Sequence, residues 1–299
     1  MSVLFVFLDG VGLGPPTPDN PFATLGLPTF ERLAGGQRWT ADATPVRQPG
    51  QTFVPVDATL GVEGLPQSGT GQGVLFTGRD AIRAHGRHFG PYPPTRVRPL
   101  VAQHSVFAQL AATVGPEQLA FANAYPERFF RLVEARGRWT VTTLAAASAG
   151  VRLRGADDLA RDLALASDLT GEGWQRRIDP THVPVSEAQA ARRLLALAGD
   201  HRLVVLEYFQ TDKAGHSQDP ARAAAVLRTL DRLFEAVLSG LDAHTLVICS
   251  DHGNLEDLAT KSHTRHPVPL VAWGPRAETF AEASSLLDVT PALVRAVAR

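Results

Sequence analysis

Three short apolar runs of strand length constrain the fold of this chain most. Residues 3–8 (VLFVFL), 203–208 (LVVLEY) and 245–250 (TLVICS) carry apolar or β-branched side chains at nearly every position. A half-exposed strand alternates apolar and polar residues, whereas a strand covered on both faces is apolar throughout. We therefore predict three strands in the interior of a sheet that is covered on both sides.

Helices with recognisable ends lie between these runs. Ser186 and Gln189 have capping-box spacing before a helix over residues 186–198, with Gly199 just past its end. Asp219 and Pro220 begin a long helix that ends before Gly240. We also expect shorter helices at 29–33, 105–114, 157–166 and from Thr290, strands at 119–122, 139–144 and 269–273, irregular or short-stranded chain at 47–63, and a loop at 85–94. This alternation predicts a three-layer α/β/α fold around a mostly parallel sheet.

Composition excludes several classes of protein. With 44% hydrophobic and 20% charged residues and a net charge of -1, the chain fits neither a disordered protein nor one that binds nucleic acid. The single cysteine, Cys249, excludes a disulfide within the chain and is expected in the core. Residues 1–10 lack the features of a signal peptide or membrane span. We expect one domain over residues 1–299, a cytoplasmic location and no membrane partner.

Acidic residues follow the three interior strands. Asp9 and Asp251 come directly after their runs, and Asp212 comes four residues after the run at 203–208. Because ligands bind at the carboxyl ends of strands in such sheets, these side chains are candidates for one shared site. Taken singly, each has an ordinary alternative, since an Asp at a strand end often forms a turn or caps a helix.

Three histidines accompany these carboxylates. His252 is adjacent to Asp251, His216 is four residues after Asp212, and His263 follows in a polar loop. Residues four apart share a face of a helix, so Asp212 and His216 can reach one ion. Carboxylates that crowd together resist ionisation unless a cation is present. The set predicts two divalent ions, about 4 Å apart, as in sites for displacement at phosphorus.

A serine in the segment LPQSGTGQGVLFTGR, residues 65–79, is the candidate nucleophile. We predict Ser68 at a helix amino terminus, where free N–H groups would bind a phosphate against residues 69–71. The alternative is that Ser68 or Thr70 only caps the helix. Asn123, Tyr125 and Arg128 follow a predicted strand and are further candidate contacts. The residues expected to contact a substrate are Gly69, Thr70, Arg79, His85, Arg87, His88, Asn123 and Lys213. Those in the loop at 85–94 alternatively face solvent.

Six segments in order resemble the alkaline phosphatase superfamily, and most of all its cofactor-independent phosphoglycerate mutase and phosphopentomutase branch. They are LDGVGLG, LPQSGTGQGVLFTG, TDKAGH, SDHGN, HTRHPVP and LLDVTPAL. The resemblance implies one metal surrounded by Asp9, Ser68, Asp251 and His252, and a second held by Asp212, His216 and His263. It favours His263 over His266, and it implies manganese (Mn²⁺) as in this branch or zinc (Zn²⁺) as elsewhere in the superfamily.

Two departures from the mutases affect the expected activity. The mutases carry a large cap domain, whereas here residues 86–184 leave room only for a small insertion or cap. The nucleophile segment reads SGTGQ in place of the mutase type SEVGH. Sulfatases are disfavoured as well, because Thr70 and Gln72 stand where their maturation signal needs Pro and Arg.

The sequence therefore predicts a metal-dependent phosphatase or phosphodiesterase. In this hypothesis Ser68 attacks a small-molecule phosphate ester, and water hydrolyses the resulting phosphoserine. One alternative is a phosphomutase, an isomerase acting on phosphoglycerate or a pentose phosphate. Another is a catalytically inactive metal-binding protein.

Overall fold

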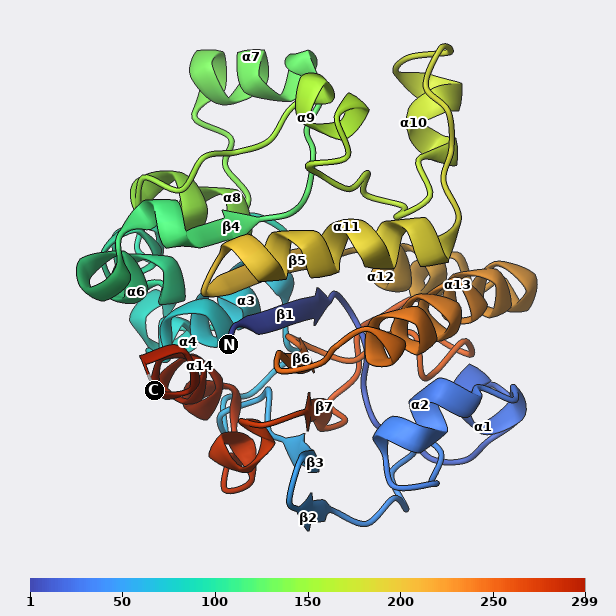
Figure 1. The fold of residues 1–299 in the computed structure, drawn as a ribbon. Coiled ribbons are helices and arrows are strands. Elements are labelled where there is room, and N and C mark those ends of the chain that lie inside the picture. The colour runs from blue at the N-terminus through green and yellow to red at the C-terminus, as the bar shows by residue number, and fades with distance from the viewer. Residues whose placement is uncertain (299) are drawn as a thin grey trace.

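A seven-stranded sheet forms the middle layer of the molecule (Figure 1). The computed structural model describes residues 1–298. The strands are β1 (Val3–Leu8), β2 (Val46–Gln48), β3 (Gln51–Val56), β4 (Leu119–Phe121), β5 (Leu203–Tyr208), β6 (Thr245–Ser250) and β7 (Val268–Trp273). Their order is β2-β3-β7-β6-β1-β5-β4, in which β6, β1, β5 and β4 are parallel neighbours. β7 is antiparallel to both β6 and β3, and β2 is antiparallel to β3. The predicted mostly parallel α/β sheet is confirmed.

The interior strands β1, β5 and β6 are buried along their whole length, as the apolar runs predicted. Alternate residues of β1 face opposite layers. Val3, Phe5 and Phe7 pack in one core, and the residues between them pack in the other. Leu8 pairs with Tyr208 on one side and Ser250 on the other, so the three strands end at the same level. This register brings the segments that follow them to one edge of the sheet.

Helices cover both faces of the sheet (Figure 1). The α-helices are α1 (Pro21–Thr24), α2 (Pro28–Leu33), α3 (Ser68–Thr77), α4 (Ala81–His85), α5 (Arg98–His104), α6 (Val106–Val114), α7 (Glu127–Arg136), α8 (Val141–Ser148), α9 (Ala156–Ala160), α10 (Glu172–Arg177), α11 (Glu187–Asp200), α12 (Gln210–Ser217), α13 (Pro220–Ser239) and α14 (Val289–Ala298). Short 3-10 helices lie at η1 (Pro116–Gln118), η2 (Ala277–Phe280) and η3 (Leu286–Asp288). Buried residues of α3, α6, α8 and α14 share one core, and those of α2, α11 and α13 share the other. None of the helices in residues 1–298 has the length and hydropathy needed to cross a bilayer.

The segment that carries α7, α9 and α10 stands apart from these layers, at the top of Figure 1 above β4 and α11. It has a small core of its own, formed by Ala124, Leu159, Ala164, Ala166 and Trp174. Its backbone joins the sheet edge through short bridges, such as the one between Asn123 and Leu165. This segment therefore lies beside the sheet, next to the edge strand β4.

Some predicted elements were wrong. Residues 139–144 were expected as a strand, because a run of β-branched residues is typical of strands. They instead lead into α8, since Thr140 accepts the N–H of Thr143 and forms a capping box with it. The helix expected at 157–166 ends at Ala160, α11 continues through Gly199 to Asp200, and His85 ends α4 instead of beginning a loop.

A buried carboxylate joins α2 to α13. Oδ1 of Asp231 accepts the N–H groups of Thr29 (2.9 Å) and Phe30 (3.0 Å) in the first turn of α2. We expect Asp231→Ala to lower the free energy of unfolding by about 1–3 kcal/mol, because two N–H groups lose their acceptor. Urea unfolding followed by circular dichroism measures this. Glu235→Ala, on the exposed side of α13, is the control; an equal loss in both variants would contradict the capping role.

Candidate metal centre

The ends of β1 and β6 bring a first group of ligands together. Asp9 follows Leu8, Asp251 follows Ser250, and Leu8 and Ser250 are register partners. Nε2 of His252 lies 3.3 Å from Oδ1 of Asp9 and 3.5 Å from Oδ2 of Asp251. One ligand atom from each of the three lies within 4.8 Å of the others, and all three residues are buried. They form one candidate metal site.

A second group lies where β5 runs into α12. Asp212 and His216 share a face of α12, and their Oδ2 and Nε2 atoms are 3.3 Å apart. Nε2 of His263 is 3.5 Å from Oδ1 of Asp212 and 3.2 Å from Nε2 of His216. Nδ2 of Asn254 donates to Oδ1 of Asp212 at 2.6 Å and fixes that carboxylate. These ligands form a second candidate site.

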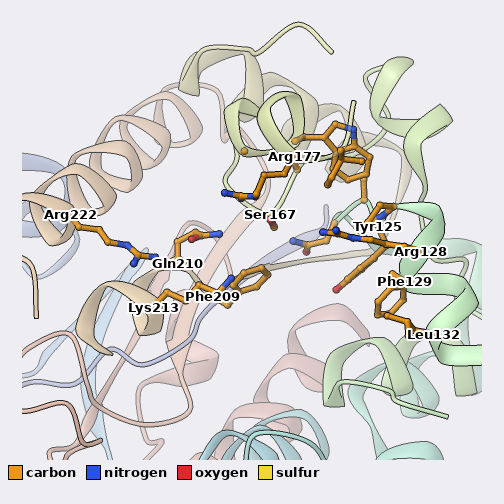
Figure 2. Close-up of a pocket in the computed structure, with 17 residues that line it drawn as sticks. Tyr125, Arg128, Phe129, Leu132, Ser167, Arg177, Phe209, Gln210, Lys213 and Arg222 are labelled. Carbon is orange, nitrogen blue, oxygen red and sulfur yellow. The ribbon is translucent and has the colours of Figure 1, made fainter. Parts of the chain in front are cut away.

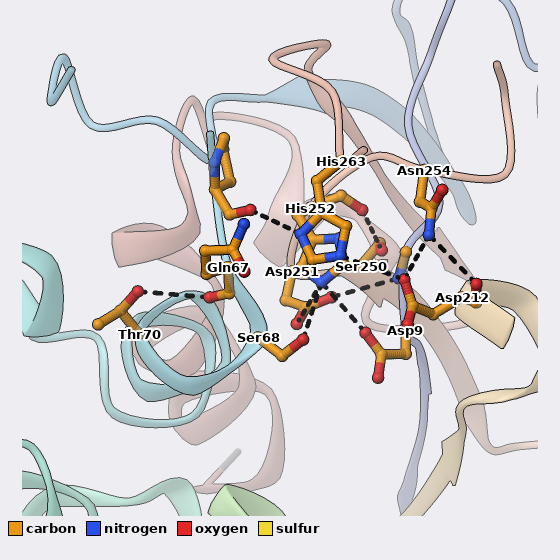
Figure 3. Close-up of polar contacts among 12 residues, drawn as sticks. Asp9, Gln67, Ser68, Thr70, Asp212, Ser250, Asp251, His252, Asn254 and His263 are labelled. Atoms are coloured by element: carbon orange, nitrogen blue, oxygen red, sulfur yellow. Dashed lines mark hydrogen bonds and ion pairs between the residues drawn. The ribbon is translucent and has the colours of Figure 1, made fainter. Parts of the chain in front are cut away.

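The two groups adjoin. The rings of His252 and His263 stack with their centroids 3.8 Å apart and an interplanar angle of 15° (Figure 3). All six side chains that the sequence singled out, from positions 9 to 263, therefore gather at the carboxyl edge of the sheet. The expected convergence of the three strand ends is seen directly in the register of β1, β5 and β6.

The histidine rings are oriented as metal ligands are. Nδ1 of His263 donates to the carbonyl of Pro66 at 2.8 Å, and Nδ1 of His216 donates to the carbonyl of Lys261 at 2.7 Å. In a neutral imidazole this leaves the Nε2 lone pair pointing into the group. Two such lone pairs 3.2 Å apart repel each other, and a cation between them removes the repulsion.

Burial and crowding perturb the carboxylates. Burial raises the pKa of Asp9, and burial together with the charge of Asp9 raises the pKa of Asp251 well above its usual range. Burial alone would lower the pKa of His252, but the charges of Asp251 and Asp9 outweigh it and raise that pKa to about 10. Burial and the charge of His252 lower the pKa of His263 to about 4. Ionising both carboxylates beside a single imidazolium is therefore unfavourable unless a cation is present.

The donor set fits divalent metal ions. Within the described residues, Oδ1 of Asp9 and Oδ2 of Asp251 are buried and accept no hydrogen bond; both share the single ion-pair contact to Nε2 of His252, at 3.3 and 3.5 Å. Buried polar atoms without partners are costly, and bound ions are one way to satisfy them. Carboxylate oxygens and imidazole nitrogens suit both manganese and zinc.

Ser68 is the first residue of α3 and faces the first group. Its Oγ lies 3.0 Å from Nε2 of His252 (Figure 3). Gly69 and Gly71 permit this placement. A Cβ at Gly69 would overlap the carbonyl oxygen of Tyr92, and a Cβ at Gly71 would crowd the carbonyl oxygen of Asp251. These glycines let the helix pack closely against its neighbours. The predicted helix start at Ser68 is confirmed.

A hollow of about 330 Å³ opens beside Ser68, and Asp212, His216 and His263 also line it. Thr70 does not reach this hollow. Its buried hydroxyl accepts the N–H of Phe89 at 3.0 Å and lies 3.3 Å from the carbonyl oxygen of Gln67 (Figure 3).

The other expected substrate contacts lie elsewhere. Arg79 follows the far end of α3, about 15 Å from Ser68 for a helix of 10 residues. His85 and Arg87 line a separate hollow. His88 lies 3.4 Å from the carbonyl of Val62, and burial lowers its pKa. Asn123 and Lys213 line a further cavity, next to α12.

Glu256 holds the loops around the candidate metal ligands in place, a role that the sequence did not reveal. This buried carboxylate accepts the N–H groups of Gly12 (2.9 Å) and Asn254 (2.8 Å), the hydroxyl of Thr264, and Nδ1–H of His266 (3.1 Å). Burial would raise its pKa, but these hydrogen bonds outweigh burial and lower it. The residue lies in a polar loop in the sequence, where a glutamate is ordinarily exposed. His266 therefore supports the loops from outside the ligand groups.

Glu207 is a second buried acid that the sequence analysis left without a role. Its Oε2 accepts hydrogen bonds from the hydroxyls of Thr142 (2.9 Å) and Tyr125 (3.2 Å). Burial and the nearby charge of Asp9 raise the pKa of Glu207 to about 7. A signal was present, since a charged residue interrupts the apolar run LVVLEY.

The sequence of the carboxy-terminal part of the chain is similar to known proteins. Residues 178–298 match the family model described as "Metalloenzyme superfamily". The 2,3-bisphosphoglycerate-independent phosphoglycerate mutase of Yersinia pestis is 30% identical over 121 residues, which are 37% of this chain and 24% of that enzyme. The same enzyme of Thiobacillus denitrificans is 30% identical over 122 residues, with the same shares covered. The match thus spans about a quarter of the length of these curated relatives.

Solved structures extend the likeness to 99% of the chain. The PH0037 protein of Pyrococcus horikoshii matches over 96% of its length, with a TM-score of 0.58 and 14% identity. The alkaline phosphatase of the Antarctic bacterium TAB5 matches over 98%, with a TM-score of 0.54 and 12% identity. Leishmania mexicana phosphoglycerate mutase matches over 95%, with a TM-score of 0.52 and 12% identity. The resemblance to the alkaline phosphatase superfamily is confirmed. At these identities the structures establish the alkaline phosphatase-like fold, and residues 178–298 contain every ligand of the two groups except Asp9.

Metal binding has a measurable consequence for stability. We expect chelation by EDTA to lower the midpoint of thermal unfolding by about 5 °C or more, because ions bound at a hundred times their dissociation constant stabilise the folded state by about 2.7 kcal/mol. Manganese or zinc should restore it. Asp251→Ala should weaken the response, and Asp200→Ala, at the exposed end of α11, should keep it. An unchanged midpoint after verified metal removal would contradict metal binding by these groups.

The contact between Glu256 and His266 predicts a pH-dependent contribution to stability. The hydrogen bond that His266 donates to Glu256 raises the pKa of His266 above its unfolded value. The stability that this bond contributes is complete below about pH 6.5 and is lost as the pH rises through the folded-state pKa. His266→Gln should therefore lower the free energy of unfolding most at acidic pH, by about 1 kcal/mol for a side chain that is 31% exposed. A difference from the parent protein that is constant between pH 5.5 and 9 would contradict this.

Proposed function

We propose that this protein is a dinuclear metal-dependent hydrolase of phosphate mono- or diesters, with Ser68 as its nucleophile. The observation that carries the proposal is the position of Ser68. Its Oγ lies 3.0 Å from His252 of the first ligand group, and it lines the same hollow as the second group. An ester bound in that hollow would have its phosphorus within reach of one hydroxyl and both groups.

The side chains divide the work as follows. Asp9, Asp251 and His252 would hold one ion, and Asp212, His216 and His263 the other. Ions so bound lower the pKa of a neighbouring hydroxyl and offset the negative charge of the phosphoryl oxygens.

The remaining features act on the phosphoryl group and on Ser68. The amino terminus of α3 directs its dipole at the phosphoryl group and favours the anion there. Oγ of Ser68 loses its proton and attacks phosphorus, the bond to the alcohol oxygen breaks, that oxygen takes up a proton from solvent, and a phosphoserine forms. Water then attacks the phosphoserine, which releases phosphate and regenerates the hydroxyl.

We further propose that residues 86–184 form a small insertion within a single domain of residues 1–299. The separate small core of the segment around α7, α9 and α10 supports this reading. In the mutases that the chain resembles, a large cap domain keeps the intermediate from water. An insertion of this size would cover less of the hollow, which favours hydrolysis over transfer back to the substrate.

The hydroxyl of Ser68 is the group whose removal tests this mechanism. Ser68→Ala should lower the hydrolysis of p-nitrophenyl phosphate by at least about 10³-fold under manganese or zinc, because no other hydroxyl occupies its position. Metal content, measured by atomic absorption, should stay unchanged, since six other side chains make up the two groups. Ser239→Ala, at the exposed end of α13, is the matched control. Parental activity in the metal-loaded Ser68→Ala protein would refute the mechanism.

A phosphomutase is the second candidate, and the curated relatives favour it because they are phosphoglycerate mutases. Product analysis separates the two activities. A hydrolase releases one orthophosphate for each ester consumed, whereas a mutase acting on phosphoglycerate or a pentose phosphate yields an isomer without orthophosphate. We expect stoichiometric orthophosphate, and an isomerised product without it would establish the mutase.

A further inference from the structure

A second cavity, of about 420 Å³, lies beside α12 and is distinct from the hollow at Ser68 (Figure 2). Three stretches of chain line it, at residues 123–132, 166–178 and 209–222. We call it the basic cavity. Its volume falls within the range of sites for small molecules, about 300–1,000 Å³. The expected substrate contacts Asn123 and Lys213 both belong to it.

The basic cavity concentrates positive charge. Arg128, Arg177, Lys213 and Arg222 line it, and no Asp or Glu is among its lining residues. In the part of the chain that the structure describes, none of the four takes part in an ion pair. Four cations that share one cavity without an acidic partner repel one another and favour an anionic ligand.

The same cavity presents aromatic and apolar surfaces. The rings of Tyr125 and Phe129 stack with centroids 4.2 Å apart and an interplanar angle of 30°. Leu132 in α7 and Ile178 after α10 are unusually exposed for apolar residues, at 45% and 37%, and both line the cavity. A simple anion leaves these surfaces uncovered, whereas a planar ring would cover them.

The cavity connects to the metal centre through α12 and β5. Lys213 lines the cavity and directly follows Asp212 of the second ligand group. Tyr125, which also lines the cavity, donates its hydroxyl to Glu207 in β5, the strand that leads into α12. The basic cavity and the second ligand group therefore share one helix, α12.

We propose that the basic cavity binds the non-reacting part of the substrate, and that this part combines an aromatic or heteroaromatic ring with a second anionic group, as in a nucleoside bisphosphate. The ring packs against Tyr125 and Phe129, and the second anion accepts hydrogen bonds from Arg177, Lys213 and Arg222. This inference rests on the proposed function, because it assigns the reacting phosphoryl group to the metal centre.

Three related ligands test the inference on metal-loaded full-length Ser68→Ala, which binds without turnover. Ribose 5-phosphate carries the reacting phosphate alone, adenosine 5′-monophosphate adds the ring, and adenosine 3′,5′-bisphosphate adds the second phosphate. Isothermal titration calorimetry gives each Kd. We expect the ring to tighten binding by about tenfold, and the second phosphate by about tenfold again.

Two further substitutions in the Ser68→Ala protein show which residues are responsible for each increase in affinity. Phe129→Leu should remove the gain from the ring, and Arg177→Met should remove the gain from the second phosphate. Both should leave the Kd of ribose 5-phosphate within about twofold. Arg83→Met is the matched control, because the Arg83 side chain is 72% exposed on α4 and lines neither cavity. It should leave the Kd of all three ligands unchanged.

The outcomes separate this inference from the proposed function. Equal binding of all three ligands would overturn the inference, even where the parent protein hydrolyses p-nitrophenyl phosphate. An equal loss of affinity for all three ligands in Phe129→Leu and Arg177→Met would overturn the inference as well, since it would show that these residues have a purely structural role. If both gains appear and vanish as expected while the parent hydrolyses no ester, the hydrolase proposal fails and the ligand class of the cavity stands.

Discussion

The closeness of buried carboxylates to one another is the constraint on which the site depends. Asp9 and Asp251 follow neighbouring strands that end at the same level, so the backbone itself holds them together. Burial raises the pKa of both, and the His252 imidazolium balances only part of their charge. A fold that keeps such a pair in its interior is stabilised by cations, and the Nε2 atoms of His216 and His263 point to the same requirement.

Glu256 shows how the surrounding loops are kept compatible with this arrangement. It joins the loop after β1 to the loop after β6 through the N–H groups of Gly12 and Asn254. Asn254 in turn donates to Asp212, which links this support to the second group. A Cβ at Gly12 would overlap the carboxylate of Glu256, so the glycine is needed for close approach. One buried acid thus positions ligands that come from three strand ends.

The sequence revealed those parts of the site that depend on a pattern of residues close together in the chain. An apolar run that stops at Asp9 or Asp251 marks both a strand and the place of its last side chain, and a serine before small residues marks a helix start. Thr70 lies close to Ser68 along the chain, yet it does not line the hollow beside Ser68, because successive residues of a helix point about 100° apart. Glu256 was missed because its partner Gly12 is 244 residues away, and no local pattern reports such a contact.

In the proposed function, chemistry and specificity come from different parts of this fold. The ligand groups rest on the edge of a buried sheet, whereas two of the three stretches that line the basic cavity belong to the segment with its own small core. α12 joins the two, since Asp212 faces the metal centre and the next residue, Lys213, faces the cavity. Successive helical residues point about 100° apart, so one helix serves both sites. On the proposed function, substitutions in the segment around α7 and α10 change the affinity for the non-reacting part of the substrate without disturbing the strands that hold the ligands.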